Sequence, residues 1–154
     1  MEIERKYLIS SVPFALSSYP CRKIEQGYLS TAPVVRIRRD NNDYILTYKS
    51  KGMMIREEYN LPLTAESYAH LRKKTDGLLI TKKRYCIPLD PYTIELDIFE
   101  GDLAPLILAE VEFPSEEEAN AFTPPEWFAK DVTYSGKYHN SYMSRYGYQP
   151  EDNQ

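Results

Sequence analysis

Within most extended segments of the chain, charged and apolar residues occupy alternate positions, so each segment has a charged face and an apolar face. The opening residues show the pattern, because Glu2, Glu4 and Lys6 fall on every second position. Side chains two residues apart share one face of a β-strand. The period of two therefore predicts strands. We predict eight of them, over residues 1–7, 24–30, 34–39, 44–50, 54–63, 79–88, 93–100 and 106–113.

Turn and helix signals separate the predicted strands. The run Asp40-Asn41-Asn42-Asp43 is a strong hairpin turn. Thr64 has the character of a helix N-cap, and the helix after it is predicted to end at Gly77. Ser115 and the three glutamates after it open a second helix, because carboxylates are favourable at the positive end of the helix dipole. A final helix is predicted over residues 139–146.

These elements define an α+β fold built on a closed sheet. Eight strands with helices inserted late in the chain fit an eight-stranded antiparallel β-barrel, which leaves no exposed strand edges. The many apolar strand faces and the few helices favour charged faces that point inward, so that the interior is a wet, charged tunnel rather than a core. No repeat or linker divides the chain. We predict one domain over residues 1–147 and a flexible tail over residues 148–154.

The inward charges are sorted by sign. Two predicted strands carry basic pairs and three carry acidic pairs, namely Arg36/Arg38, Lys82/Arg84, Glu2/Glu4, Glu95/Asp97 and Glu110/Glu112. An ordinary sheet also turns a charged face to solvent, but surface strands usually mix signs because like charges on neighbouring strands repel. Clustered Arg and Lys bind phosphate oxygens, and clustered carboxylates hold Mg²⁺ or Mn²⁺. Together they predict a site for a short phosphate chain and a metal ion.

Composition narrows the class of protein and its partners. The chain has 154 residues, of which 27% are charged, and its net charge is -4, which argues against nucleic-acid binding by bulk attraction. The apolar stretches are too short for a transmembrane helix, and the charged amino terminus predicts no secretory signal. Cys21 and Cys86 fit a reduced cytoplasmic protein. We expect a small-molecule partner, no nucleic acid or membrane, and a monomer or homodimer.

The opening run Glu2-Ile3-Glu4-Arg5-Lys6 resembles the E-x-E-x-K signature of the CYTH superfamily, the triphosphate tunnel metalloenzymes. Further motifs follow in the family's order and span nearly the whole chain. They are Gln26-Gly27-Tyr28-Leu29, Arg36-Ile37-Arg38, Thr47-Tyr48-Lys49, Arg56-Glu57-Glu58-Tyr59, Lys82-Lys83-Arg84-Tyr85, Glu95-Leu96-Asp97-Ile98-Phe99-Glu100-Gly101, Glu110-Val111-Glu112-Phe113 and Lys137-Tyr138-His139-Asn140. The size and the motif around Glu110 look most like compact bacterial members that hydrolyse inorganic triphosphate. The resemblance implies an eight-stranded tunnel plugged at one mouth by the C-terminal helix.

The resemblance also implies roles for individual residues. One or two ions of Mg²⁺ or Mn²⁺ are expected on Glu2, Glu4, Asp97, Glu110 and Glu112. The triphosphate is expected on Lys6, Arg36, Arg38, Lys49, Arg56, Lys82, Arg84 and Lys137. For the proton of the attacking water, one hypothesis uses a carboxylate (Glu2, Glu4 or Glu112), and the other uses the pair of Lys49 and Tyr28. Both stay open.

Two positions depart from the family pattern, and His139 adds an open role. Asn60 stands where relatives often carry a further Glu, and Lys137 stands where they often carry Arg, so one acidic contact and one bidentate fork are lost. His139 lies near the plug, and a role in phosphate binding or gating is considered for it. The leading hypothesis is metal-dependent hydrolysis of inorganic triphosphate to pyrophosphate and phosphate. The alternatives are a class IV-type adenylate cyclase, a thiamine triphosphatase and a non-catalytic module that binds polyphosphate or nucleotides.

Overall fold

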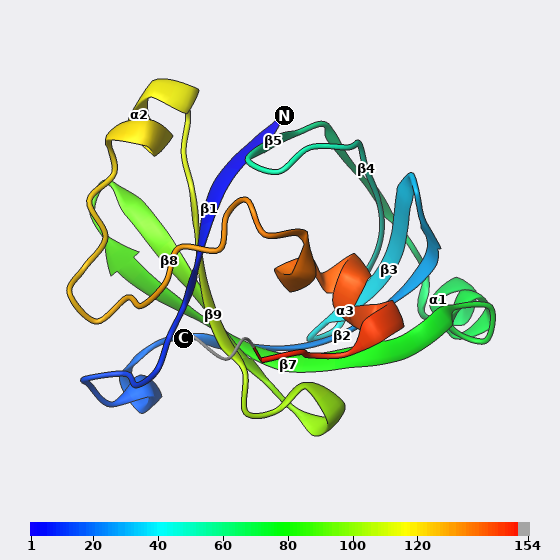
Figure 1. Cartoon of the computed structure of the whole chain (residues 1–154). Coiled ribbons are helices and arrows are strands. Elements are labelled where there is room, and N and C mark those ends of the chain that lie inside the picture. The colour runs from blue at the N-terminus through cyan, green and yellow to red at the C-terminus, as the bar shows by residue number, and fades with distance from the viewer. Residues whose placement is uncertain (151–154) are drawn as a thin grey trace.

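The computed structural model describes residues 1–150 and forms one antiparallel sheet that curls into a nearly closed barrel (Figure 1). Its nine strands follow the order β5-β1-β9-β8-β7-β2-β3-β4-β6. The strands are β1 (Glu2–Leu8), β2 (Cys21–Thr31), β3 (Val34–Asp40), β4 (Asp43–Lys49), β5 (Ile55–Arg56), β6 (Glu58–Pro62), β7 (Asp76–Leu89), β8 (Tyr92–Phe99) and β9 (Ile107–Glu112). The antiparallel barrel predicted from the alternation is confirmed.

One predicted strand is divided, which gives nine strands rather than eight. The segment predicted over residues 54–63 forms β5, which pairs with β1, and β6, which pairs with β4. The break falls at Glu57, whose carbonyl oxygen accepts from the backbone N–H of Ser50 and whose N–H donates to the Ser50 hydroxyl. The two ends of the sheet are thus consecutive pieces of chain, and no ladder joins β5 to β6 within the described part of the protein.

The three α-helices lie where the sequence predicts them. They are α1 (Ala65–Arg72), α2 (Glu116–Ala121) and α3 (Asn140–Tyr146), with short 3₁₀ turns at η1 (Leu16–Ser18), η2 (Gly101–Leu103) and η3 (Gly136–Tyr138). The hydroxyl of Thr64 accepts from the N–H of Ser67 at 3.0 Å, which caps α1, and Ser115 caps α2 in the same way. None of the helices in residues 1–150 has the length and apolar character needed to cross a membrane.

The prediction that the first helix ends at Gly77 is wrong. Helix α1 stops at Arg72, and Gly77 already belongs to β7, whose first residue Asp76 pairs with Tyr28 of β2. Gly77 has φ of 70°, and a Cβ there would collide with the backbone carbonyl oxygen of Ser144 in α3. The glycine is therefore needed for the close passage of β7 beneath α3, and it does not terminate a helix.

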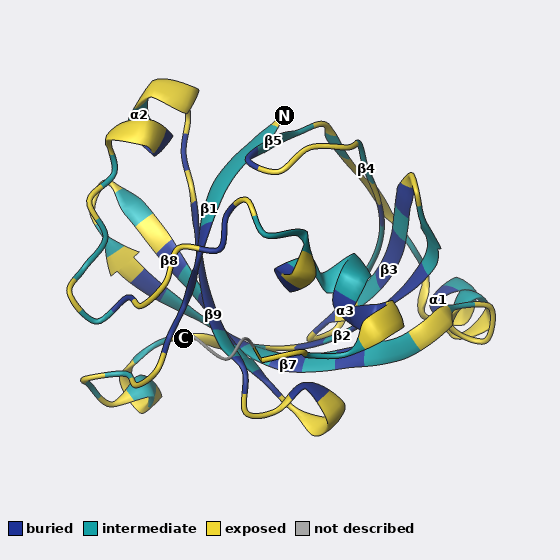
Figure 2. Cartoon of the chain, viewed as in Figure 1, coloured by how far each residue is buried: buried dark blue, intermediate teal, exposed yellow. Residues whose placement is uncertain are grey.

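Two apolar clusters hold the barrel, one on each side of its wall. The outer cluster covers β1, β9 and β8 beneath α2 and includes Tyr7, Val111 and Ala119. The inner cluster fills one end of the barrel, where Met143 of α3 packs against Leu108 of β9 and its neighbours. Figure 1 shows α3 set into the ring of strands, and Figure 2 shows buried positions on the strands around it.

The prediction of a wholly charged interior therefore holds for only half of the barrel. The inward alternation of β1 runs from Glu4 through Lys6 to Leu8, and that of β9 runs from Glu110 to Leu108. The strands thus change from charged to apolar residues along the inner face, and α3 buries the apolar half. Burial of this surface is favourable at about 25 cal/mol per Å².

The segment after α2, residues 129–133, which we call the strap, connects β1 to the chain that leads into the plug helix α3. The N–H of Leu8 donates to the carbonyl oxygen of Lys130 at 2.8 Å, and the N–H of Val132 donates to that of Lys6 at 2.9 Å. Arg5 also forms an ion pair with Asp131 at 2.6 Å. The strap therefore lies against the edge of β1 and leads the chain into η3 and α3.

The remaining sequence predictions concern the cysteines and the tail. Cys21 and Cys86 are both free thiols. Of the tail predicted over residues 148–154, residues 151–154 lie outside the described residues, and Tyr148 packs against the inner cluster with its ring 6.5 Å from that of Tyr138.

Candidate functional site

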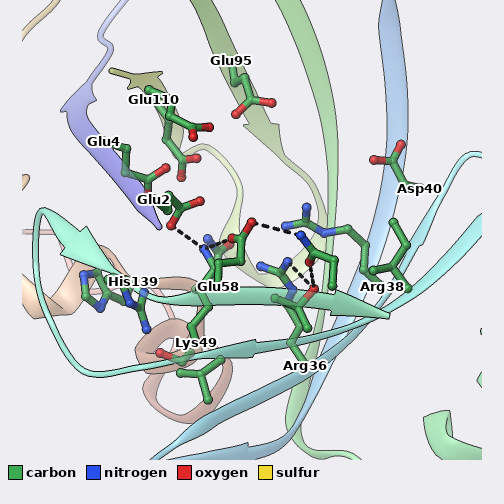
Figure 3. Close-up of a pocket in the computed structure, with 18 of the residues that line it drawn as sticks. Glu2, Glu4, Arg36, Arg38, Asp40, Lys49, Glu58, Glu95, Glu110 and His139 are labelled. Carbon is green, nitrogen blue, oxygen red and sulfur yellow. Dashed lines mark hydrogen bonds and ion pairs between the residues drawn. The ribbon is translucent and has the colours of Figure 1, made fainter. Parts of the chain in front are cut away.

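The charged half of the barrel encloses a cavity of about 250 Å³, shown in Figure 3. All nine strands and the start of α3 contribute to its lining. The predicted site residues in the lining are Glu2, Glu4, Lys6, Tyr28, Arg36, Arg38, Lys49, Arg56, Arg84, Glu110 and Glu112. The structure therefore gathers most of the predicted set around one space.

Strand register places the carboxylates on one wall of the cavity. Glu4 of β1 lies opposite Glu112 of β9, and Glu110 of β9 lies opposite both Lys6 and Glu95. Figure 3 shows Glu2, Glu4 and Glu110 grouped on one side, with Arg36, Arg38 and Lys49 on the other. We call the first group, with Glu112 opposite Glu4, the carboxylate wall. We call the second group, with the other basic residues of the lining (Lys6, Arg56 and Arg84), the cationic wall.

Burial without enough positive charge marks the carboxylate wall. Burial raises the pKa of Glu4 to about 8, with further contributions from the nearby carboxylates of Glu110 and Glu2. Burial also raises the pKa of Glu2 and of Glu112. A hard divalent cation would relieve this repulsion, and carboxylate oxygens are the ligands that Mg²⁺ and Mn²⁺ prefer. The donor set therefore fits such an ion.

The carboxylates do not yet form a closed coordination shell. Within residues 1–150, no three His, Cys, Asp or Glu side chains stand close enough together to hold a metal ion. Binding of an ion to this wall would thus draw the side chains of Glu2, Glu4 and Glu112 toward one another. Burial is the main cause of the raised pKa values of these three carboxylates, and repulsion from neighbouring carboxylates raises them further.

Glu110 differs from its neighbours because cations already compensate it. Its carboxylate lies 3.3 Å from Lys6 Nζ and 3.3 Å from Arg84 Nη2. Burial by itself would raise the pKa of Glu110, but Lys6 and Arg84 outweigh burial and hold that pKa well below its usual range. Glu110 is therefore ionised and joins the two walls.

Arg36 and Arg38 of the cationic wall lack negatively charged partners in the described part of the chain, whereas Lys49 is paired with Glu2 and Glu58. Arg36 donates to the Thr47 hydroxyl at 3.2 Å, and Arg38 donates to the amide oxygen of Gln26 at 2.9 Å, so both contacts are neutral. The buried Nε of Arg36 has no hydrogen-bond partner among the described residues. Burial, with the charges of Arg36 and Arg84, lowers the pKa of Arg38 to about 9. Uncompensated guanidinium groups of this kind are suited to phosphate oxygens.

Lys49 and Tyr28, predicted as a catalytic pair, line the cavity separately. The amine of Lys49 contacts Glu2 at 3.0 Å and Glu58 at 3.3 Å, whereas the hydroxyl of Tyr28 accepts from Gln26 at 3.3 Å. No hydrogen bond between Lys49 and Tyr28 occurs in the described structure. Their catalytic role stays a prediction.

Three predicted residues lie outside the cavity lining. Asp97 and Lys82 are fully buried behind it and form an ion pair at 2.7 Å. Asp97 also receives two hydrogen bonds from Arg84, at 2.7 and 2.8 Å. Lys137 is exposed in η3. The metal contact of Asp97 and the phosphate contacts of Lys82 and Lys137 stay predictions.

His139 enters the cavity from the N-terminus of α3. Burial and the charges of Lys6, Arg56 and Lys49 lower its pKa to about 3, so the imidazole is neutral. Asn60, where relatives often carry Glu, also lines the cavity and accepts from the Thr47 hydroxyl at 2.6 Å.

Sequence reasoning missed Arg22, Asp40 and Glu95, which also line the cavity. Arg22 was missed because β2 begins three residues earlier than predicted. Its even-numbered position would have assigned it to the inner face. Asp40 was assigned to a turn, and Glu95 was recognised as part of an acidic pair but received no role.

An antiparallel tunnel with facing carboxylate and cationic walls defines a class of metalloprotein that binds short phosphate chains. Comparison with known proteins agrees with this class. A family model described as the CYTH domain matches residues 1–146, and the chain belongs to this family.

Relatives of known activity share most of the chain. An inorganic triphosphatase of Nitrosomonas europaea is 40% identical over an alignment of 148 residues, and the match covers 93% of this chain and 96% of the relative. An inorganic triphosphatase of Acetivibrio thermocellus is 32% identical, with 96% and 95% of the two chains covered. The crystal structure of the inorganic triphosphatase NE1496 matches with a TM-score of 0.70 at 36% identity and covers 94% of each chain.

Proposed function

We propose that the protein is a metal-dependent triphosphatase that hydrolyses inorganic triphosphate to pyrophosphate and phosphate inside the barrel. The observation that carries this proposal is the pair of facing walls. Among the described residues, Glu4 and Glu112 have no ion pair, and Arg36 and Arg38 contact only neutral groups. A divalent ion would supply the missing positive charge, and a phosphate chain would supply the missing negative charge. The names of the two curated relatives support the same activity.

The metal is proposed to be Mg²⁺ or Mn²⁺, held by Glu2, Glu4 and Glu112 with Glu110 beside them. When bound, such an ion stabilises negative charge as a Lewis acid and lowers the pKa of a bound water. Asp97 belongs to the predicted metal set, but its ion pairs with Lys82 and Arg84 favour a positioning role, in which it fixes Arg84 against the cavity.

The cationic wall is proposed to bind and orient the phosphate chain. Lys6, Arg36, Arg38, Lys49, Arg56 and Arg84 face the cavity and offer charge-assisted hydrogen bonds to its oxygens. As water attacks the terminal phosphorus, the bond from that phosphorus to the bridging oxygen breaks and negative charge develops on the leaving pyrophosphate. Guanidinium groups already held in place stabilise that charge without rearrangement.

Glu4 is proposed as the base that takes a proton from the attacking water. The pKa of Glu4 is about 8 in the metal-free protein. A divalent ion bound at this wall would leave the carboxylate ionised and able to accept a proton from the attacking water. The pair of Lys49 and Tyr28 is the second candidate, since both side chains face the same cavity.

The cavity favours inorganic triphosphate over the larger substrates. Adenine or thiazolium and pyrimidine rings need an apolar or aromatic surface on which to stack. Among the described residues of the lining, Tyr28 is the only aromatic ring apart from the imidazole of His139. Adenylate cyclase and thiamine triphosphatase activities are therefore less favoured, and the retained carboxylates favour an enzyme over a binding module.

The test is release of phosphate from triphosphate, ATP, thiamine triphosphate and long polyphosphate, each with Mg²⁺, with Mn²⁺ and with a chelator. We expect rapid release from triphosphate that the chelator abolishes. Formation of cyclic AMP from ATP, with no release from triphosphate, would contradict the proposal. Full turnover by both Glu4→Gln and Glu112→Gln under saturating Mg²⁺ would contradict the metal assignment alone.

We further propose that the enzyme acts in the cytoplasm as a monomer or homodimer, with no nucleic acid or membrane partner. The free thiols of Cys21 and Cys86 agree with a reducing compartment. The net charge of -4 disfavours nucleic acid as a partner.

A further inference from the structure

Arg22, Asp40 and Glu95 form an ion network on the cavity wall that the proposed mechanism does not use. Arg22 Nη1 lies 3.2 Å from a carboxylate oxygen of Asp40, and Nη2 lies 3.2 Å from Glu95 Oε2. The same oxygen of Glu95 lies 3.3 Å from Arg84 Nη1. Strands β2, β3 and β8 thus each contribute one charged side chain to a network that reaches the fixed arginine of β7.

The network lies at the end of the cavity away from the plug. Arg22 is at the start of β2 and Asp40 is the last residue of β3, whereas Tyr28, further along β2, packs in the apolar cluster under α3. Six residues of strand separate Arg22 from Tyr28, which is a distance of about 20 Å. In Figure 3, Asp40 and Glu95 lie on the side of the cavity away from His139. Arg22 is therefore the outermost of the arginines on β2, β3 and β7 that face the cavity.

Arg22 is held more loosely than the arginine opposite it. Its side chain is 37% exposed, and its Nε is buried without a hydrogen-bond partner in the part of the chain that the structure describes. Arg84, its direct neighbour across the strands, is 6% exposed and bonds Asp97 at 2.7 and 2.8 Å. Arg84 is thus fixed, while Arg22 keeps a free donor and two exchangeable ion pairs.

We propose that Arg22 is the outermost phosphate-binding side chain, which exchanges its ion pairs with Asp40 and Glu95 for the third phosphoryl group of a linear chain. This inference rests on the proposed function and deepens it. The carboxylates of Asp40 and Glu95 disfavour an anion at the mouth of the cavity, so a phosphoryl group is bound there only through Arg22. A chain of three phosphates reaches Arg22, whereas pyrophosphate, bound deeper among Arg36, Arg38 and Lys6, does not. Arg22 therefore selects for chain length.

Calorimetric binding of triphosphate and of pyrophosphate to the metal-free protein at low ionic strength tests this inference without requiring turnover. For Arg22→Gln we expect the Kd for triphosphate to rise about tenfold or more, because a charge-assisted contact is lost, while the Kd for pyrophosphate changes less than about twofold. Arg39→Gln is the matched control, because Arg39 is exposed on β3 and makes the same change of charge. It should leave both Kd values within about twofold.

The outcomes separate this inference from the proposed function. An equal loss for both ligands, or no loss for either, in Arg22→Gln would overturn the role of Arg22 even if wild-type protein hydrolyses triphosphate. Selective loss of triphosphate binding would support it even if hydrolysis is absent. Should Arg22→Gln fail to fold, as judged by circular dichroism, Arg22→Lys retains the charge but not the fork and should show a smaller loss in the same direction, confined to triphosphate.

Discussion

At the scale of single residues, the site is defined by charges that the protein leaves uncompensated. Glu4 and Glu110 face the same cavity from neighbouring strands, yet the pKa of Glu4 is raised to about 8 and that of Glu110 is far below its usual range. The difference comes from Lys6 and Arg84, which contact Glu110. One carboxylate is therefore neutralised by the fold, and the other is available to a metal ion.

Protonation of Glu4 makes a first prediction about pH. The folded-state pKa of Glu4 is about 8, whereas its ordinary value is 4.5. Between about pH 4.5 and pH 8, the folded protein therefore holds a proton on Glu4 that the unfolded protein has released. The metal-free protein should therefore lose stability as pH rises from about 4.5 to about 8, and Glu4→Gln should flatten that slope. Below about pH 8, metal binding should release about one proton and strengthen about tenfold per pH unit. Melting temperatures with a chelator, and metal titrations across this range, measure both effects.

The control for this prediction is Glu126→Gln, which removes an exposed carboxylate outside the cavity. It should keep the wild-type slope of stability against pH. A Glu4→Gln variant that also keeps the wild-type slope would show that Glu4 is ionised throughout.

A second residue-scale prediction concerns the buried partner of Arg84. Asp97→Asn leaves Lys82 and Arg84 without their main counter-charge in a fully buried position, so we expect a loss of about 3 kcal/mol in the free energy of unfolding. Glu25→Gln breaks the exposed pair with Arg72 and should cost about 1 kcal/mol or less. Urea denaturation of the two variants gives the comparison, and equal losses would contradict the importance of burial.

At the scale of elements, the close passage of β7 and α3 decides whether the tunnel is plugged. Gly77 sits directly beneath the carbonyl oxygen of Ser144, and Met143 of the same helix is fully buried in the inner cluster. The plug therefore depends on a residue without a side chain in β7. It also depends on the strap, which is hydrogen-bonded to β1 and leads the chain into η3.

The substitution Gly77→Ala should push α3 away from β7. The alanine has a left-handed backbone conformation and its Cβ collides with Ser144, so we expect a loss of about 2–4 kcal/mol in stability and weaker protection of α3 from hydrogen exchange. Gly147→Ala is the control, since Gly147 has φ of 74° but a Cβ added there would meet no atom within 4 Å. Its cost, about 1–3 kcal/mol, should come from the backbone conformation alone. Equal effects of the two changes would show that contact with Ser144 is unimportant.

At the scale of the whole molecule, the barrel is a tunnel with one blind end. The inner apolar cluster, which includes Tyr138 and Met143, fills the end near α3. We therefore infer that a substrate reaches the charged cavity from the opposite end, where the carboxylates of Asp40 and Glu95 are found. On this inference, a linear phosphate chain enters with one chain end first.

This geometry predicts discrimination between linear and cyclic phosphates. Cyclic trimetaphosphate has no chain end and cannot extend between Arg36 and Arg22, so its hydrolysis should be slower than that of linear triphosphate by on the order of 100-fold or more. Phosphate release measured with both compounds under saturating Mg²⁺ tests this. Comparable rates would contradict end-first entry.

Local sequence determined which side chains face the interior and how their charges are sorted. The period of two placed Glu2, Glu4 and Lys6 on one face, because side-chain direction in a strand follows from backbone geometry alone. The caps at Thr64 and Ser115 were equally local. The same alternation, followed three residues further toward the N-terminus of β2, would have found Arg22.

Only the tertiary structure decided which of these charges are already paired. Asp97 and Glu4 belong to similar acidic pairs in the sequence, but register across β7 and β8 sets Asp97 against Arg84 and leaves Glu4 opposite Glu112. The position of α3 likewise decided that one half of the barrel is a core and the other a cavity. The pairing of charges and the filling of one end of the barrel depend on strands and helices that are far apart in the chain. A local sequence pattern does not determine the register that joins them.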